Sequence, residues 1–230
     1  RFMVTDLIFD NGRLIATTAP DGVVLRIGDD GETEQLWDLP VDYVWDIGRS
    51  AGGDLLACTG SSGKIYRLDP GGEFSELFAM SQAHVLCMAA NSEYTYFGTA
   101  SEGVVYRASK DGSYTALFDR KDEDINDLAV APEGTEHAGS VFVAFGKSGR
   151  SGKGGVYRID PDGGTTELYE QSGVAVYSLG WMNGHLYAGT GDEGKLLAIE
   201  DEDRHSSVYD SEDESVTCLQ PLGSGRMFAA

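Results

Sequence analysis

Short apolar segments alternate with turn residues along the whole chain, and these segments recur in a fixed order. Each repeat begins with a branched aliphatic residue and a second apolar residue three positions later, as in Val44 and Ile47. A glycine-containing turn follows, and then further apolar segments such as 54–60 and 63–68. Short runs rich in Val, Ile, Tyr and Thr between turn residues predict antiparallel strands that are joined as a meander.

The spacing of the repeat indicates the fold. The second apolar residue of the first strand recurs every 40 or 41 residues, except for a step of 51 between Leu128 and Leu179. Two insertions, at 133–139 and 147–154, account for the longer step. Four short strands cannot bury both faces of their sheet alone, and radial packing of such sheets covers these faces. The sequence therefore predicts an all-β fold, a β-propeller of four-stranded antiparallel blades, with a solenoid as the structural alternative.

The repeat register divides the chain into blades. We interpret 1–230 as a single, incomplete propeller domain with five complete blades and part of a sixth. No outer strand precedes Arg1 to complete the last blade, so we expect six or seven blades in the intact protein. The predicted blades lie at about 2–38, 42–80, 83–120, 124–171 and 174–210, with a partial blade at 215–230.

Two segments carry a resemblance to a known repeat. These are His185-Leu-Tyr-Ala-Gly-Thr-Gly and Gly155-Val-Tyr-Arg-Ile-Asp-Pro-Asp-Gly. They resemble bacterial WD40-like or NHL-like propeller repeats, and the likeness extends over essentially the whole chain. The chain departs from typical WD40 repeats because it lacks the Gly-His pair and a regular closing Trp-Asp pair. The resemblance implies a propeller fold and does not imply a particular activity.

Charge and cysteine content narrow the range of partners. The chain has 38 acidic and 17 basic residues, a net charge of −21. Such a surface repels nucleic acid and anionic lipid, so we predict no nucleic-acid binding, and no segment is apolar for long enough to insert into a membrane. Solubility explains the charge, and a cationic partner or a salt-rich habitat is the alternative. Three cysteines without CxxC spacing, each in an apolar strand, predict buried thiols and favour a cytoplasmic location; a removed leader would instead indicate an extracytoplasmic one.

Polar residues recur at one equivalent position within the first strand of several repeats, and we call this set a column. Its members include Asp6, Asp46, Asp127 and Ser178. Inner strands line the central channel of similar propellers, so these side chains are candidates to bind a small ligand or a divalent cation there. The alternative interpretation is that they accept hydrogen bonds from backbone or water, or cap turns. We predict no resident cofactor.

A second candidate lies in the insertion of the fourth repeat. Lys147, Arg150 and Lys153 form the only basic cluster in this acidic chain, on a long loop between two strands. Such a loop on a rigid scaffold is suited to a partner contact, and a flexible basic loop without a partner is the alternative.

A recurring arginine column has a structural interpretation, in which each stem packs between blades and each head pairs with a carboxylate. Its members are Arg26, Arg67, Arg107 and Arg158.

No catalytic arrangement stands out in the chain. The four histidines occupy non-equivalent positions in separate repeats, without the spacing of metal ligands or of a catalytic triad. We therefore predict a non-catalytic interaction or scaffold module that binds a protein, as a subunit of a larger assembly. Two alternatives stay open: a metal-dependent lactonase-like hydrolase or small-ligand binder that uses Asp6, Asp46 and Asp127, and an architectural segment of a multidomain surface protein.

Overall fold

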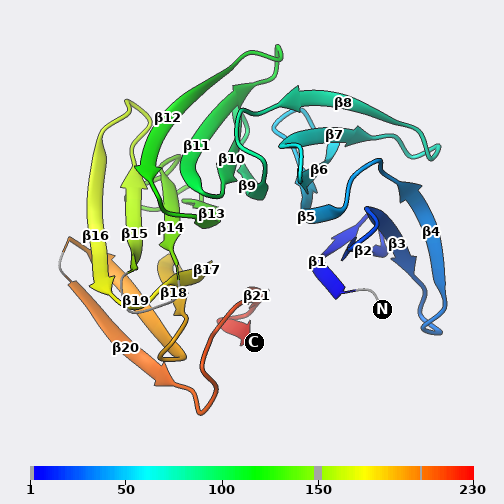
Figure 1. The fold of residues 1–230 in the computed structure, drawn as a ribbon. Helices are drawn as coiled ribbons and strands as arrows, with labels where there is room; N and C mark the ends of the chain where they lie inside the picture. The colour runs from blue at the N-terminus through cyan, green and yellow to red at the C-terminus, as the bar shows by residue number, and fades with distance from the viewer. Residues whose placement is uncertain (1–2, 148–151, 203) are drawn as a thin grey trace. The chain divides into compact units, whose positions relative to one another are not determined.

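Antiparallel β-strands make up the regular structure of the chain. The computed structural model describes residues 3–147, 152–202 and 204–230, in which 22 strands alternate with turns and no helix occurs. The strands form five four-stranded sheets and one two-stranded sheet, and Figure 1 shows each large sheet as neighbouring arrows that follow one another in sequence. This confirms the predicted all-β fold of four-stranded antiparallel blades. No helix in the described residues is long and apolar enough to cross a membrane.

The chain divides into two compact units. The first comprises 1–101 and 106–116, and the second comprises 102–105 and 117–230. The first unit holds the first two blades and much of the third, and its innermost strands pack in succession, β1 against β5 and β5 against β9. The strands of these three blades are β1 (Met3–Asp10), β2 (Arg13–Ala19), β3 (Val23–Ile27), β4 (Thr33–Asp38), β5 (Tyr43–Arg49), β6 (Leu55–Gly60), β7 (Lys64–Leu68), β8 (Phe74–Ala79), β9 (Val85–Ala90), β10 (Tyr94–Thr99), β11 (Glu102–Ser109) and β12 (Tyr114–Lys121).

The second unit holds the fourth and fifth blades and a two-stranded sheet. Its innermost strands also pack in succession, β13 against β17 and β17 against β21. Its remaining strands are β13 (Ile125–Val130), β14 (Val141–Gly146), β15 (Lys153–Ile159), β16 (Thr165–Ser172), β17 (Val176–Met182), β18 (His185–Thr190), β19 (Lys195–Asp201), β20 (Arg204–Asp210), β21 (Leu219–Gly223) and β22 (Arg226–Ala229).

The hairpins follow from local turn chemistry. Asn11 and Gly12 have φ values of 49° and 77°, and Asn183 and Gly184 have 54° and 81°. Two successive residues with positive φ form a type I′ turn, whose twist matches that of the flanking strands, and Asn-Gly is the preferred pair. The sequence thus specifies the tight turns between β1 and β2 and between β17 and β18.

Buried apolar residues form clusters that each span two successive blades. In the first unit, Ile15 and Trp37 of blade one pack with Val44 and Ile47 of blade two. In the second unit, Phe142 of blade four belongs to the same cluster as residues of blade five. Because each blade buries its faces against its neighbours, the core lies between the sheets, as expected for stacked repeats.

Candidate functional site

A β-bulge interrupts the innermost strand of the complete blades just before the polar column identified in the sequence. The pairing of β1 with β2 shifts between Val4 and Asp6, and equivalent shifts precede the other column members. A bulge adds one residue to its strand and changes the direction of the side chains that follow. We call four of these side chains the bulge residues: Asp6, Asp46, Asp127 and Ser178.

The carboxylates among the bulge residues connect successive blades. Asp6 Oδ2 accepts a hydrogen bond from the backbone N–H of Ile47 at 3.1 Å. Asp46 Oδ2 accepts one from Met88 N at 2.5 Å. In both cases the donor belongs to the innermost strand of the next blade. The two aspartates therefore provide a repeated polar connection between blades of the first unit.

The second unit repeats this contact. Asp127 Oδ2 accepts a hydrogen bond from Leu179 N at 2.7 Å, and its Oδ1 accepts one from Leu128 N at 2.7 Å. Ser178 Oγ donates to Val216 O at 3.2 Å. These are the backbone contacts that the alternative interpretation of the column describes. The assignment of the bulge residues to a ligand site stays a prediction.

The bulge residues were also considered as ligands of a divalent cation. Such a cation takes several oxygen ligands at short distances. In the part of the chain that the structure describes, no three His, Cys, Asp or Glu side chains gather as a metal site. Asp6 and Asp46 belong to the first unit and Asp127 to the second, and the use of these three side chains by a ligand or a cation stays a prediction.

The cysteines differ in their surroundings. Burial raises the pKa of the Cys58 thiol well above its usual value, and the charges of Asp46 and Asp6 raise it further. The thiolate is the nucleophilic form, so Cys58 is unsuited to nucleophilic chemistry. Cys87 is also buried, whereas Cys218 is exposed. The expectation of three buried thiols is wrong for Cys218, because this residue lies in the segment before β21 and its side chain does not pack into a core cluster.

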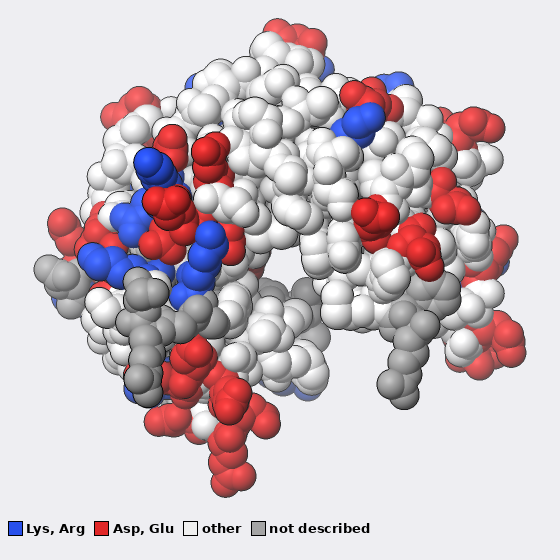
Figure 2. Space-filling model, in the orientation of Figure 1, with Lys and Arg blue, Asp and Glu red and all other residues white. Residues whose placement is uncertain are grey.

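The basic insertion of blade four meets carboxylates of its own blade. Lys147 Nζ lies 3.5 Å from Asp124 Oδ1, and Lys153 Nζ lies 2.5 Å from Glu170 Oε1. Arg150 lies outside the described residues. Figure 2 shows blue and red atoms intermixed over this part of the second unit. The two described lysines therefore present a partly neutralised surface, and their role in a partner contact stays a prediction.

Glu170 also forms an ion pair with an arginine side chain. Arg120 Nη2 lies 3.0 Å from Glu170 Oε2, and its guanidinium carbon lies 4.2 Å from the centroid of the Phe145 ring. The hydrogen bond from Lys153 is the main cause that lowers the pKa of Glu170, and burial opposes it. Nearby, burial raises the pKa of Glu123, whose buried Oε2 has no hydrogen-bond partner among the described residues.

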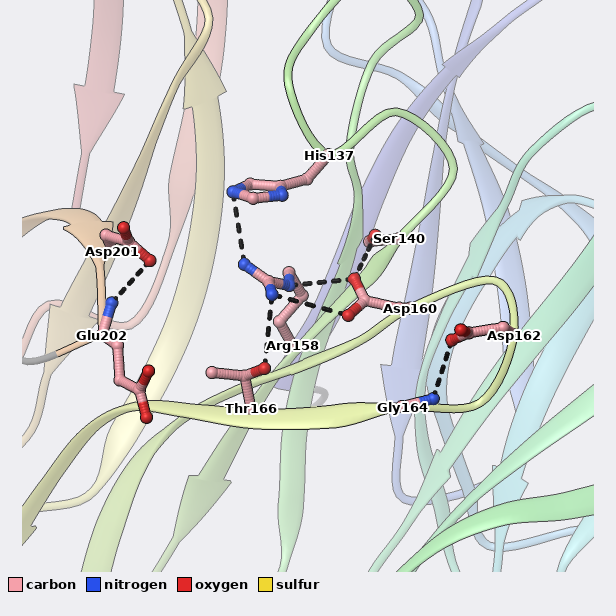
Figure 3. Close-up of polar contacts among 9 residues, drawn as sticks. All are labelled: His137, Ser140, Arg158, Asp160, Asp162, Gly164, Thr166, Asp201 and Glu202. Atoms are coloured by element: carbon pink, nitrogen blue, oxygen red, sulfur yellow. Dashed lines mark hydrogen bonds and ion pairs between the residues drawn. The ribbon is translucent and has the colours of Figure 1, made fainter.

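Arg158 of β15 is the centre of a polar network in the second unit (Figure 3). Its Nε donates to Asp160 Oδ1 at 2.9 Å, and its Nη2 donates to Thr166 Oγ1 at 3.2 Å. Ser140 Oγ donates to the same Asp160 oxygen at 2.9 Å. Arg158 Nη1 lies 3.2 Å from His137 Nε2, and His137 belongs to the insertion at 133–139. The pairing with Asp160 agrees with the structural interpretation of the arginine column.

This network forms one wall of a groove between blades four and five. The groove has a volume of about 250 Å³ and is lined by residues of both blades, including Phe142, Arg158, Trp181 and His185. Trp181 packs edge to face against Phe142 with 5.2 Å between ring centroids. The buried Nε1 of Trp181 has no hydrogen-bond acceptor among the described residues.

A comparable groove lies between blades one and two in the first unit. It also has a volume of about 250 Å³, and Asp10, Arg13, Trp37 and Arg49 contribute to its walls. Arg49 binds Asp10 through two hydrogen bonds, of 2.8 Å from Nε and 2.6 Å from Nη2. Trp37 Nε1 donates to Asp69 O at 3.1 Å, so its N–H is satisfied within the protein.

Sequence reasoning did not identify the groove between blades four and five. The two histidines lack ligand spacing in the sequence, whereas His137 and His185 both line this groove because two blades pack against each other there. A usable signal was present, because the insertion at 133–139 interrupts an otherwise constant repeat. Insertions into repeats form loops on one face, which is often the binding face.

Comparison with known proteins agrees with this fold. The profile of the family described as SMP-30/Gluconolactonase/LRE-like region matches residues 50–183. This match covers more than half of the chain, and the chain belongs to this family. A search of curated proteins found no match.

Solved structures provide further fold neighbours. Virginiamycin B lyase from Staphylococcus aureus superposes with a TM-score of 0.74 at 13% identity, over 99% of this chain and 75% of the lyase chain. A chain of the nidogen/laminin complex superposes with a TM-score of 0.68 at 12% identity, over 98% of this chain and 82% of that chain. At such identities the likeness shows the fold alone, and it confirms the β-propeller.

Proposed function

We propose that the chain is a non-catalytic β-propeller module that binds a protein partner. The observation that supports this most is the use of the bulge carboxylates. Asp6, Asp46 and Asp127 each accept a backbone N–H of the following blade. A carboxylate held in this way stabilises the packing of one blade on the next. The three aspartates that the hydrolase alternative would use therefore have a structural task that accounts for their recurrence.

The partner contact is assigned to the edge of blade four that carries Lys147 and Lys153. Each lysine lies beside one carboxylate, and both side chains remain substantially exposed, at 40% and 54%. An acidic partner segment competes with Asp124 and Glu170 for these ammonium groups. Charged groups at the rim of an interface mainly change the association rate and its dependence on salt.

The test of this contact is charge reversal. The double variant K147E/K153E, compared with K110E at an exposed turn elsewhere, is used to retain partners from a lysate of the source at moderate salt. A partner that wild type and K110E retain in stoichiometric amount, and that the double variant loses, supports the proposal. Equal retention by all three proteins removes this edge from the proposal, and the absence of any partner contradicts the proposed function.

The second candidate function is a metal-dependent lactonase-like hydrolase, which membership of a family that includes gluconolactonases favours. Its test is a melting experiment with millimolar Ca²⁺, Mn²⁺ or Zn²⁺ and a hydrolysis assay with a panel of aldonolactones. A ligand that binds only the folded state raises the melting temperature. We expect no saturable shift and no hydrolysis above the spontaneous rate. A shift that D46N abolishes, together with hydrolysis, would establish the hydrolase instead.

A further inference from the structure

The groove between blades one and two differs from the other inter-blade grooves in the balance of its charges. Two arginines, Arg13 and Arg49, and one carboxylate, that of Asp10, line it. The groove between blades four and five is lined instead by one arginine and by the two carboxylates of Glu136 and Glu200. A third groove, between blades two and three, has equal numbers of basic and acidic side chains. The first groove therefore has an excess of positive charge in a chain whose net charge is −21.

The carboxylate of this groove is neutralised within the protein. Arg49 donates to both oxygens of Asp10, at 2.8 Å and 2.6 Å, and Asn11 Nδ2 donates to Oδ2 at 3.1 Å. The hydrogen bond from Arg49 lowers the pKa of Asp10, so this carboxylate is ionised at neutral pH and its charge is balanced by the guanidinium. The positive charge that remains in the groove is that of Arg13.

The guanidinium of Arg13 is accessible to a ligand. Arg13 begins β2 directly after the Asn11-Gly12 turn, and it is exposed. In the part of the chain that the structure describes, its side chain forms no ion pair and no hydrogen bond. A guanidinium has five N–H donors in a planar fork, and this fork matches the two oxygens of a carboxylate. Because Arg13 needs no internal partner to be released, an anion binds it without breaking an existing pair.

Apolar side chains supply the rest of the groove. Leu36 is partly buried and Pro70 is exposed, so both offer apolar surface that a ligand reaches. The volume of about 250 Å³ lies below the range of roughly 300–1,000 Å³ that holds drug-sized ligands. The groove therefore suits an apolar body of about one ring. Buried residues of both blades lie beneath it: Ile15, Trp37, Leu55 and Leu68.

We propose that this groove binds a small monocarboxylate with an apolar body of about one ring. The two oxygens of the ligand accept hydrogen bonds from the fork of Arg13, and its apolar body lies against Leu36 and Pro70. One unpaired guanidinium balances one negative charge, so the net charge of the chain disfavours a dianion. This combination of an apolar wall with a few placed polar groups is typical of small-molecule sites.

The site is separate from the bulge residues. Asp10 ends β1 and follows Asp6 by four positions, which is about 13 Å along an extended strand. The proposal therefore uses other side chains than the hydrolase alternative, and it goes beyond the proposed contact with a protein partner.

The experiment is a ligand-observed NMR titration of the full chain at low ionic strength. The probes are phenylacetate and 4-methylpentanoate, their uncharged amides, and acetate, which has the charge without the apolar body. We expect saturable binding of at least one of the two larger carboxylates in the millimolar range, since ligands of this size bind weakly. Its amide and acetate should bind at least about fivefold more weakly, because each lacks one part of the contact. Absence of saturation for both larger carboxylates overturns the proposal, as does equal binding of the amide or of acetate.

Matched variants locate the site. R13Q removes the charge, and we expect about fivefold weaker binding of the carboxylate or more. The control is R67Q, because Arg67 is also exposed and without an ion pair among the described residues, and it lines the groove between blades two and three. Both variants change the net charge equally, so R67Q should bind like wild type. Equal affinity of R13Q and wild type, or equal weakening by R67Q, overturns the proposal.

A second pair of variants keeps the test decisive if R13Q does not fold. L36A removes apolar surface from the groove, and L77A does so in the groove between blades two and three. We expect about twofold weaker binding for L36A or more, and no change for L77A. Equal affinity of L36A and L77A overturns the proposal. Retention of a protein partner is a separate measurement, so the two proposals fail independently.

Discussion

The groove between blades one and two and the groove between blades four and five have equal volumes, about 250 Å³ each, and different polar walls. In the first groove, Trp37 Nε1 donates to Asp69 O and Arg49 binds Asp10, so these polar groups are paired within the protein. In the second, Trp181 Nε1 has no acceptor among the described residues, and an insertion brings His137 to Arg158. The repeat thus determines the volume of the groove between two blades. Local departures from the repeat determine which polar groups line the groove and whether they are paired.

The largest expected difference concerns the two tryptophans. Trp37 is buried at 6% exposure and belongs to the core cluster of its unit, so W37A should lower the free energy of unfolding by about 3–5 kcal/mol. Trp181 is only partly buried and packs at the border of its cluster, so W181A should cost about half as much. Chemical denaturation of the two variants measures both values. Equal losses would show that the second groove is packed as tightly as the first.

The bulge aspartates at these two junctions provide the next comparison. Asp127 accepts backbone N–H groups of Leu128 and Leu179, both at 2.7 Å, whereas Asp6 accepts one from Ile47 at 3.1 Å. Removing a partly buried acceptor leaves N–H groups unsatisfied, so D127A should cost about 1–3 kcal/mol of unfolding free energy. D6A should cost less. A larger loss in D6A than in D127A, by the same denaturation measurement, would contradict this account of the connection between blades.

The groove arginines should differ by a smaller amount. The side chain of Arg158 is 14% exposed and holds Asp160 and Thr166, so R158A should cost about 2 kcal/mol. The side chain of Arg49 is 39% exposed, and solvent screens its pair with Asp10, so R49A should cost at most about 1 kcal/mol. The measurement is again the midpoint and slope of denaturation. Similar losses would indicate that exposure does not separate the two pairs.

The smallest expected effect is a pH dependence of the first groove. The hydrogen bond from Arg49 lowers the pKa of Asp10 below its value in the unfolded chain. The stability that this pair contributes is therefore complete above the unfolded carboxyl pKa of about 4 and is lost as pH falls through the lower folded value. Denaturation midpoints between pH 6 and pH 2 should fall less steeply for D10N than for wild type. Parallel curves would show that Asp10 does not contribute to acid sensitivity.

The repeat was readable from the sequence because its determinants are local and recur. Residues such as Val44 and Ile47 mark one inner strand, and their equivalents recur in each repeat. Asn-Gly pairs specify the hairpin turns at Asn11 and Asn183. The division into blades and the single domain over 1–230 stay predictions. The burial of Cys218 was predicted wrongly, because a strand pattern does not state whether a neighbouring blade covers it.

The geometry of the candidate sites could be predicted from the sequence less well than the repeat. The sequence identified Asp6, Asp46 and Asp127 as one column but did not reveal the bulges that bring each carboxylate to the next blade. A bulge depends on the register between two strands, and register depends on the partner strand. The contact of His137 with Arg158 was also missed, because His137 lies in the connection between β13 and β14 whereas Arg158 lies on β15, and their distance depends on the folded blade.

Sequence by itself determined the all-β repeat, the four strands of each blade and the acidic surface, since alternation, turn residues and charge are properties of short segments. The tertiary structure decided which polar groups meet. It placed the bulge carboxylates on backbone N–H groups of the following blade, and it left the N–H of Trp181 without an acceptor among the residues that the structure describes. The physical reason is that a hydrogen bond depends on distances of a few tenths of an ångström between segments tens of residues apart, and only the packing of one blade on the next sets those distances.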